Sequence, residues 1–292
     1  MTMAVLNHAA VGRLLPDTGT LRARPLPQGR FNSCWHLTGS GRSYLLKLND
    51  REGEAHLRRV AAAMRDAAAG GVAVPRVLHV GTDPDVGPFL LQEWLDGRTF
   101  AEARQDGAIE TGLWSRLGHQ IALLHSTQPA PPLTATPASR TRKLSDLLAY
   151  LRDHRLIPSA LAEATRRRGQ PLAEQLGEQA CVSTHQDIYP DNILVRPGGQ
   201  IALLDFDHAT AAEYASDFVK LDRWCLPSNR DRQLLLGAYW QQRGEPADPL
   251  FEQRLAFHRL VINLSYFLYW HGRDPTQIPG CTAALRTELE RA

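Results

Sequence analysis

The sequence lacks the features that mark several protein classes. No apolar run reaches the ~18 residues that a membrane-spanning helix needs, so we expect no membrane partner. Residues 1–15 do not combine a basic start with a long apolar stretch, so we expect no signal peptide. The four cysteines lie far apart and form no C-x-x-C pair. A disulfide framework and a zinc knuckle are therefore not expected, and the predicted location is the reducing cytoplasm.

The chain also has little net charge and very little lysine. Its 33 basic and 31 acidic residues leave a formal charge of +2 that is not clustered, which argues against nucleic acid as a partner. Lysine occurs only at Lys47, Lys143 and Lys220. A hydrophobic content of 43% is that of a globular protein. Because lysine is so rare here, Lys47, which lies inside an apolar strand-like segment, is a candidate functional residue.

The order of the expected elements predicts an α+β chain. Residues 35–38 and 44–48 have a hairpin pattern, 52–69 have helical spacing that ends at Gly70, and 89–94 are strand-like. The remainder is mostly helical, apart from a short β section at 181–206. We therefore expect a small β-rich N-lobe over residues 1–95 and a helical C-lobe over 96–292.

The strongest chemical pattern is a polar loop followed by an acidic motif. His185, Asp187 and Asn192 form H-x-D-x-x-x-x-N, and Asp205 begins D-F-D thirteen residues after Asn192, beyond a strand, a turn and a second strand. Phosphoryl transfer needs a group that accepts the hydroxyl proton and cations against the phosphates. One carboxylate would supply the first, and an amide with a second carboxylate would hold Mg²⁺. The alternative is a polar loop whose side chains only form turns.

These motifs resemble the aminoglycoside phosphotransferase and choline-kinase group, relatives of the protein kinases, over about residues 25–245. That group usually has H-G-D-x-x-x-x-N followed by D-x-D or D-x-E. The resemblance implies a bilobal protein-kinase-like fold and magnesium-dependent kinase activity. It implies that Asp187 is the catalytic base, that Asn192 and Asp205 are the metal ligands, and that His185 braces the loop.

The chain departs from the usual pattern of this group in three places within the loop. Gln186 stands where glycine is usual, Tyr189 where histidine is common, and Asp191 where glycine is frequent. Further on, the 213–218 segment resembles G-D-P-x-x-D-L only in part, with Asp217 at the second aspartate. None of these changes removes a charged role, but we expect them to alter the substrate entrance.

The N-terminal half supplies the expected nucleotide contacts. Lys47 would pair with the α- and β-phosphates, although an edge-strand lysine that extends to solvent is the plain alternative. The resemblance implies that a helix acid holds Lys47, with Glu52 as first choice and Glu54 as second. Both acids would equally suit the positive end of a helix dipole.

Two further segments are assigned to the nucleotide by position. The turn over the phosphates would include Gly29, Asn32 and Ser33, because the segment resembles the group's G-x-x-N loop ahead of Lys47. The backbone of Glu93 and Leu95 would contact the purine edge at the hinge. Plain loop structure is the alternative reading of both segments, because backbone contacts place few demands on side chains.

The predicted function is ATP- or GTP-dependent O-phosphorylation of a small hydroxylated acceptor. Residues 96–292 contain 22 basic and 23 acidic residues, so no strong acidic field would attract a polycation. Tyr266, Tyr269 and Trp270 are either core residues or a stacking surface for a flat acceptor. A neutral or weakly charged antibiotic is the favoured acceptor. The alternatives are a primary-metabolite kinase for choline, homoserine or a sugar, and a pseudokinase that binds nucleotide without turnover.

Overall fold

The structure is a computed structural model that describes residues 8–15, 21–26, 32–49, 51–107, 110 and 112–291. The chain folds as two compact units, each made of three segments. The first unit comprises Met1–Thr127, Asp187–Thr210 and Ser228–Arg243; the second comprises Gln128–Gln186, Ala211–Pro227 and Gly244–Ala292. The lobe boundary expected after residue 95 stays a prediction.

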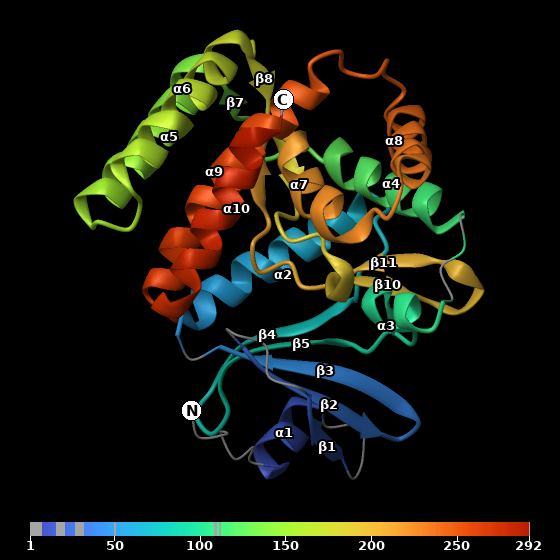
Figure 1. Ribbon diagram of the computed structural model, residues 1–292. Helices are drawn as coiled ribbons and strands as arrows, with labels where there is room; N and C mark the ends of the chain where they lie inside the picture. The colour runs from blue at the N-terminus through green and yellow to red at the C-terminus, as the bar shows by residue number, and fades with distance from the viewer. Residues whose placement is uncertain are drawn as a thin grey trace. The chain divides into compact units, whose positions relative to one another are not determined.

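A five-stranded antiparallel sheet forms the N-terminal part of the first unit, in the order β1-β2-β3-β5-β4 (Figure 1). Its strands are β1 (Arg22–Pro25), β2 (Ser33–Gly39), β3 (Arg42–Leu48), β4 (Val77–Asp83) and β5 (Gly87–Glu93). The predicted hairpin is therefore β2 and β3, whose turn has Ser40 and Gly41 at positive φ.

The two faces of this sheet carry different residues because side chains alternate along a strand. Leu46 and Leu48 of β3 pack with Val11 of α1 (His8–Leu14) in one apolar cluster. Lys47 lies between these two leucines and therefore points to the other face. Helix α2 (Gly53–Ala69) packs against β4 and β5 and buries an apolar stripe. Alternation along β3 thus separates the lysine from the apolar cluster.

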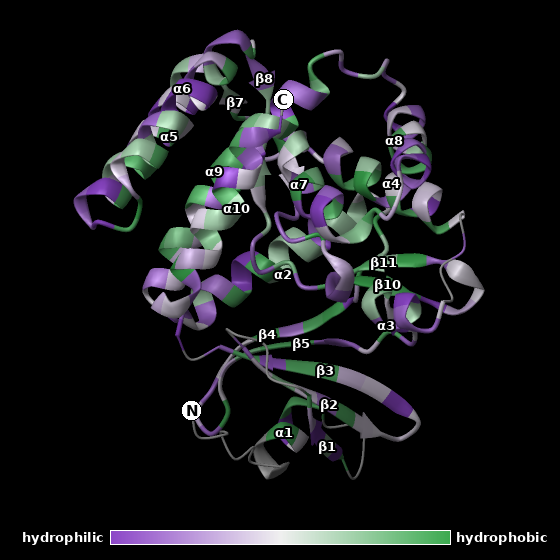
Figure 2. Ribbon diagram, viewed as in Figure 1, coloured by the Kyte–Doolittle hydropathy of each residue, from purple (hydrophilic) through white to green (hydrophobic). Residues whose placement is uncertain are grey.

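The rest of the first unit consists of helices and a small sheet. A three-stranded sheet has the order β11-β10-β6, and Figure 2 shows β10 and β11 as strongly hydrophobic. Helix α4 packs closely on α8 at Gly118, where a Cβ would overlap the carbonyl oxygen of Leu235. The elements are β6 (Arg98–Thr99), α3 (Phe100–Gln105), α4 (Gly112–Ser126), η2 (Pro190–Asn192), β10 (Ile193–Val195), η3 (Pro197–Gly199), β11 (Ile201–Leu203) and α8 (Asn229–Arg243).

The second unit is mainly helical. Helices α5, α6, α9 and α10 share a core that includes Leu144, Leu161, Leu264, Phe267 and Leu285. The elements are β7 (Thr134–Ala135), α5 (Pro137–Asp153), α6 (Ser159–Gln175), β8 (Gln179–Ala180), β9 (Val182–Thr184), β12 (Thr210–Ala212), η4 (Tyr214–Asp217), α7 (Phe218–Lys220), η5 (Leu221–Cys225), α9 (Phe251–His271), η6 (Pro275–Gln277) and α10 (Ile278–Glu290). Strand β12 begins at the last residue of a first-unit segment.

The predicted fold class is confirmed: an antiparallel sheet with one long helix is followed by a mainly helical region. On α9, Phe267 is fully buried, while Tyr266, Tyr269 and Trp270, which the sequence left as core or stacking residues, are half-buried. No helix in the described part of the chain is long and apolar enough to cross a membrane.

Candidate active site

The β10–β11 hairpin places Asn192 and Asp205 at the same end of two paired strands. Ile193 pairs with Leu203 in the antiparallel register. One step beyond, the Leu204 amide donates to the Asn192 carbonyl oxygen at 2.9 Å. Asp205 is the next residue, with a positive φ of 60°. Hairpin pairing therefore explains why residues thirteen positions apart reach one place.

Asp187, the predicted catalytic base, is joined to this end of the hairpin by a side-chain contact. Asn192 Nδ2 donates to Asp187 Oδ2 and to the Asp187 carbonyl oxygen, both at 2.9 Å. Asn192 is buried and sits at the end of the short helix η2, which Pro190 opens. Because its amide nitrogen is used by Asp187, its Oδ1 is the atom that remains for another ligand.

Lys47 is brought to the same place from the sheet. Its Nζ lies 2.6 Å from Asp205 Oδ1 and 2.8 Å from Asp207 Oδ1. Burial acts to lower the pKa of Lys47, but the carboxylates of Asp205 and Asp207 outweigh it and raise the pKa. The amine therefore stays charged at neutral pH. Asp187, Asn192, Asp205 and Lys47 are thus gathered within the first unit.

The structure does not bring the predicted helix acids to Lys47. Glu52 Oε2 lies 2.8 Å from His56 Nδ1, one turn further along α2. Glu54 accepts from Thr82 and Arg58 at the surface. Lys47 contacts the two D-F-D carboxylates instead. The side chain that α2 buries next to Asp207 is His56 rather than an acid, so no helix acid is available to Lys47 there.

The segments expected to contact the nucleotide are only partly described. Gly29 lies outside the described residues. Asn32 is buried, and its Nδ2 makes a short contact to Asp207 Oδ2, whereas Ser33 begins β2. At the expected hinge the Glu93 amide donates to the Arg76 carbonyl at 3.0 Å. Leu95 follows the strand, half-buried. The Glu93 amide is therefore already used, which directs any purine contact at Glu93 to its carbonyl.

Three residues of this site were not assigned from the sequence: Asp207, His56 and Tyr189. Asp207 was visible as the second acid of D-F-D, but its contact with Lys47 depends on tertiary structure. His56 had no signal beyond its place in a helical stripe. Burial and then the carboxylates of Asp191, Asp187 and Asp205 raise the pKa of Tyr189 to about 12. Its phenol therefore stays protonated beside the catalytic loop.

In the second unit, Asp217 fixes the backbone of the residues that lead into the loop. Its two carboxylate oxygens accept from the amides of His185 at 2.8 Å and Gln186 at 2.6 Å. Gln186 adopts a positive φ of 62°, and its side chain donates to Thr184 and Ser216. His185 is fully buried. These contacts are those of a brace for the loop.

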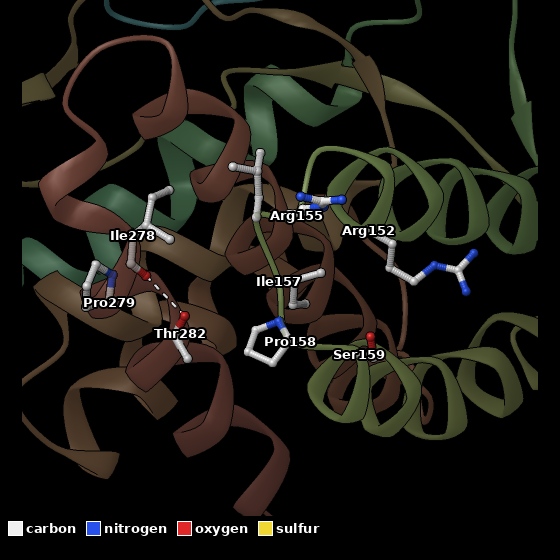
Figure 3. Close-up of a pocket in the computed structure, with 9 residues that line it drawn as sticks. Arg152, Arg155, Ile157, Pro158, Ser159, Ile278, Pro279 and Thr282 are labelled. Atoms are coloured by element: carbon white, nitrogen blue, oxygen red, sulfur yellow. Dashed lines mark hydrogen bonds between the residues drawn. The ribbon is translucent and has the colours of Figure 1, made fainter.

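The second unit also contains a cavity of about 480 Å³ that includes none of these residues. Figure 3 shows its lining, which comes from the end of α5, the segment that connects α5 to α6, the start of α6 and the start of α10. Its lining residues are Arg152, Arg155, Leu156, Ile157, Pro158, Ser159, Ile278, Pro279 and Thr282. None of them carries a carboxylate, so this cavity lacks the groups that phosphoryl transfer needs.

The family model described as "Phosphotransferase enzyme family" matches residues 22–253, a range that includes every residue placed above in the candidate site. The chain belongs to this family. It is therefore a phosphotransferase. No curated protein matches the chain by sequence.

Solved structures share the fold over nearly the whole chain. The macrolide 2'-phosphotransferase MphH from Brachybacterium faecium has 20% identity and a TM-score of 0.65, covering 98% of both chains. A thermostable mutant of aminoglycoside phosphotransferase APH(4)-Ia, complexed with AMP-PNP and hygromycin B, has 14% identity and a TM-score of 0.72, covering 98% of this chain and 99% of its own. A putative fructosamine-3-kinase from Haemophilus somnus 129PT has 13% identity and a TM-score of 0.72, covering 97% and 96%.

Proposed function

We propose that this phosphotransferase uses Mg²⁺ and ATP or GTP to phosphorylate a hydroxyl of a small natural product, in an antibiotic-inactivating or self-resistance role. The observation that carries the proposal is the gathering of Lys47, Asp187, Asn192 and Asp205 within one unit. The four free cysteines support a reducing, cytoplasmic setting.

Asn192 and Asp205 suit a magnesium site. Magnesium prefers hard oxygen ligands, and it is usually bound by one or two protein groups together with phosphates and water. Asn192 Oδ1 and the Asp205 carboxylate supply such oxygens, and the Asp205 side chain is 42% exposed. No cluster of three or more His, Cys, Asp or Glu that could hold a metal occurs in the described ranges, so substrate phosphates and water would complete the coordination. When bound, the ion would neutralise charge on the phosphates.

The chain's own residues would then do three things. Lys47 would turn from the aspartates to the α- and β-phosphates of the nucleotide. Asp187 would orient the acceptor hydroxyl and accept its proton, while the Asn192 amide holds that carboxylate in place. Gly29, Asn32 and Ser33 would cover the phosphates, and Glu93 and Leu95 would contact the purine through their backbone. Glu52 would contribute indirectly, as argued below.

The proposed acceptor is neutral or weakly charged. The second unit carries a half-exposed aromatic group in which Trp224, 38% exposed, meets Tyr266 edge to face at 6.4 Å. Arg223 lies 5.0 Å over the Trp224 ring and Arg273 lies 4.2 Å over Tyr269. Rings already faced by guanidinium groups favour flat or apolar acceptors over polycations. The similarity to a macrolide phosphotransferase supports a macrolide antibiotic. A nucleoside or a peptide antibiotic would meet the same requirement of a flat or weakly charged acceptor.

A primary-metabolite kinase is the second candidate, because one of the similar structures is a putative fructosamine-3-kinase. A pseudokinase is disfavoured, since none of the four key groups has been lost.

The test is an acceptor panel with labelled ATP and GTP, run with wild type and with Asp187→Ala as the inactive control. Macrolides, nucleoside and peptide antibiotics and aminoglycosides form one arm. Choline, homoserine and fructosamine form the other. We expect turnover in the first arm, strongest with uncharged acceptors. Turnover confined to the second arm would remove the resistance role.

A further inference from the structure

Asp207 is far more enclosed than its neighbour Asp205 in the candidate site. Its side chain is 8% exposed, against 42% for Asp205 two residues earlier. Three side chains surround it: Lys47 at 2.8 Å, Asn32 through a short amide contact, and His56, whose Nε2 lies 3.8 Å from Asp207 Oδ1. Of these three, only Lys47 is permanently cationic.

This arrangement means that Asp207 would lose its cationic partner when nucleotide binds. On the proposed function, on which this inference rests, Lys47 turns to the phosphates. The exposed Asp205 can then meet the metal and solvent, but the enclosed Asp207 loses its closest cation. Only the neutral Asn32 amide then remains on Asp207, and an enclosed carboxylate without a cationic partner is unfavourable. Nucleotide binding therefore favours a second group that takes the place of Lys47 at Asp207.

His56 is placed to do this. It is buried on α2, and its Nδ1 lies 2.8 Å from Glu52 Oε2, which fixes the ring with Nε2 toward Asp207. A ring that partners two carboxylates donates from both nitrogens, so the replacement of Lys47 uses the imidazolium form of His56. The present 3.8 Å separation exceeds a normal hydrogen bond by about 1 Å. We infer that His56 is a positioning residue that replaces Lys47 as the partner of Asp207 when Lys47 binds nucleotide.

The inference gives Glu52 a role different from the predicted one. Glu52 would hold His56, and His56 would hold Asp207. Lys47 would then be released from Asp207 and could contact the phosphates. The link between α2 and the D-F-D motif then runs through an imidazole rather than through a direct acid–lysine pair. Side-chain partners that orient a group in direct contact with a ligand are a general way to fix such sites.

The experiment measures nucleotide affinity and folding separately. AMP-PNP and GMP-PNP binding is titrated by calorimetry, with and without Mg²⁺, well below the unfolding temperature. The variants are His56→Ala, His56→Gln, which keeps an N–H donor, and Glu52→Gln. His119→Ala, an exposed histidine on α4 of the same unit, is the matched control. Thermal unfolding without nucleotide is recorded for each.

We expect His56→Ala to weaken nucleotide binding about tenfold or more, because truncating one partner of a buried charged contact is costly. His56→Gln should recover most of the affinity, Glu52→Gln should lie between, and His119→Ala should match wild type. Wild-type affinity in folded His56→Ala would overturn the inference. So would a lower unfolding temperature with unchanged affinity, which marks a structural role. If wild type itself binds neither nucleotide, the proposed function fails first and this inference falls with it.

Discussion

Each unit of the molecule contains a cluster of charged side chains, and the two clusters differ in how far these side chains are buried and paired. In the second unit, Arg140 clamps Glu213 with contacts of 2.6 and 3.0 Å and also donates to the carbonyls of Leu176 and Gly177. Both side chains are at most 5% exposed. In the first unit, Lys47 holds Asp205, which is 42% exposed.

The difference distinguishes a network suited to a structural role from one that we propose to be reactive. A guanidinium whose three nitrogens all donate to fixed protein oxygens has no nitrogen left to bind a ligand. A lysine shared between an exposed and an enclosed carboxylate can exchange partners. If charge and burial were the only criteria, the Arg140 cluster would be the stronger candidate for a functional site. The exposed Asp205 carboxylate makes the Lys47 cluster the stronger candidate instead. The predictions below test this contrast.

Removing the catalytic-loop carboxylate should have the largest effect on activity. Asp187→Ala is expected to lower kcat by roughly 10²–10⁴, the range for loss of a general base, with the unfolding temperature nearly unchanged. Steady-state kinetics and thermal unfolding of the same samples check this. Asp191→Ala, an exposed acid four residues on, is the matched control. Full activity in Asp187→Ala would remove the base assignment.

Breaking the closed network should instead cost stability. Arg140→Ala leaves the Glu213 carboxylate buried without its main partner, which is expected to cost about 3–5 kcal/mol. Chemical denaturation gives the unfolding free energy. Arg142→Ala, which changes an exposed arginine on the same helix, is the comparison variant. Arg140→Ala as stable as that variant would show that the network is not structural.

The same network should make stability depend on acidic pH. Burial acts to raise the pKa of Glu213, but the His258 ring, whose Nε2 lies 3.3 Å from Glu213 Oε2, and the Arg140 guanidinium outweigh it and lower the pKa from 4.5 to about 2. The folded pKa is therefore below the unfolded one. The stability from Glu213 is fully present above pH 4.5 and is lost as pH falls toward 2. Unfolding temperatures across this interval should fall more steeply in wild type than in Glu213→Gln.

The fold class could be predicted from local sequence pattern, and the candidate site residues were singled out by local motifs together with the family resemblance. Strand alternation, one long helix and two acidic motifs separated by a hairpin were all local. The partners were not predictable in this way. Whether Glu52 meets Lys47 or His56 depends on which side chain α2 buries, which is a matter of tertiary packing. The two-unit division likewise joins segments far apart in the chain, such as Met1–Thr127 and Ser228–Arg243.

The smallest expected effect concerns the departure at Gln186. Its positive φ of 62° is unfavourable for a side-chain-bearing residue, yet its amide side chain donates at 2.8 Å to Thr184 and 2.5 Å to Ser216. Gln186→Gly removes both the backbone strain and the two hydrogen bonds, so the effects oppose each other. Gln186→Ala removes only the hydrogen bonds and keeps the strain.

We therefore expect Gln186→Ala to be less stable than Gln186→Gly by about 1 kcal/mol, the usual cost of positive φ for a residue with a Cβ. Gln186→Gly should stay within about 1 kcal/mol of wild type, because a net hydrogen bond is worth a similar amount. Denaturation curves of the three proteins measure both differences. Equal stability of the alanine and glycine variants would mean that the backbone relaxes once the side chain is removed. In that case the left-handed geometry before Asp187 is imposed by the glutamine itself rather than by the fold around it.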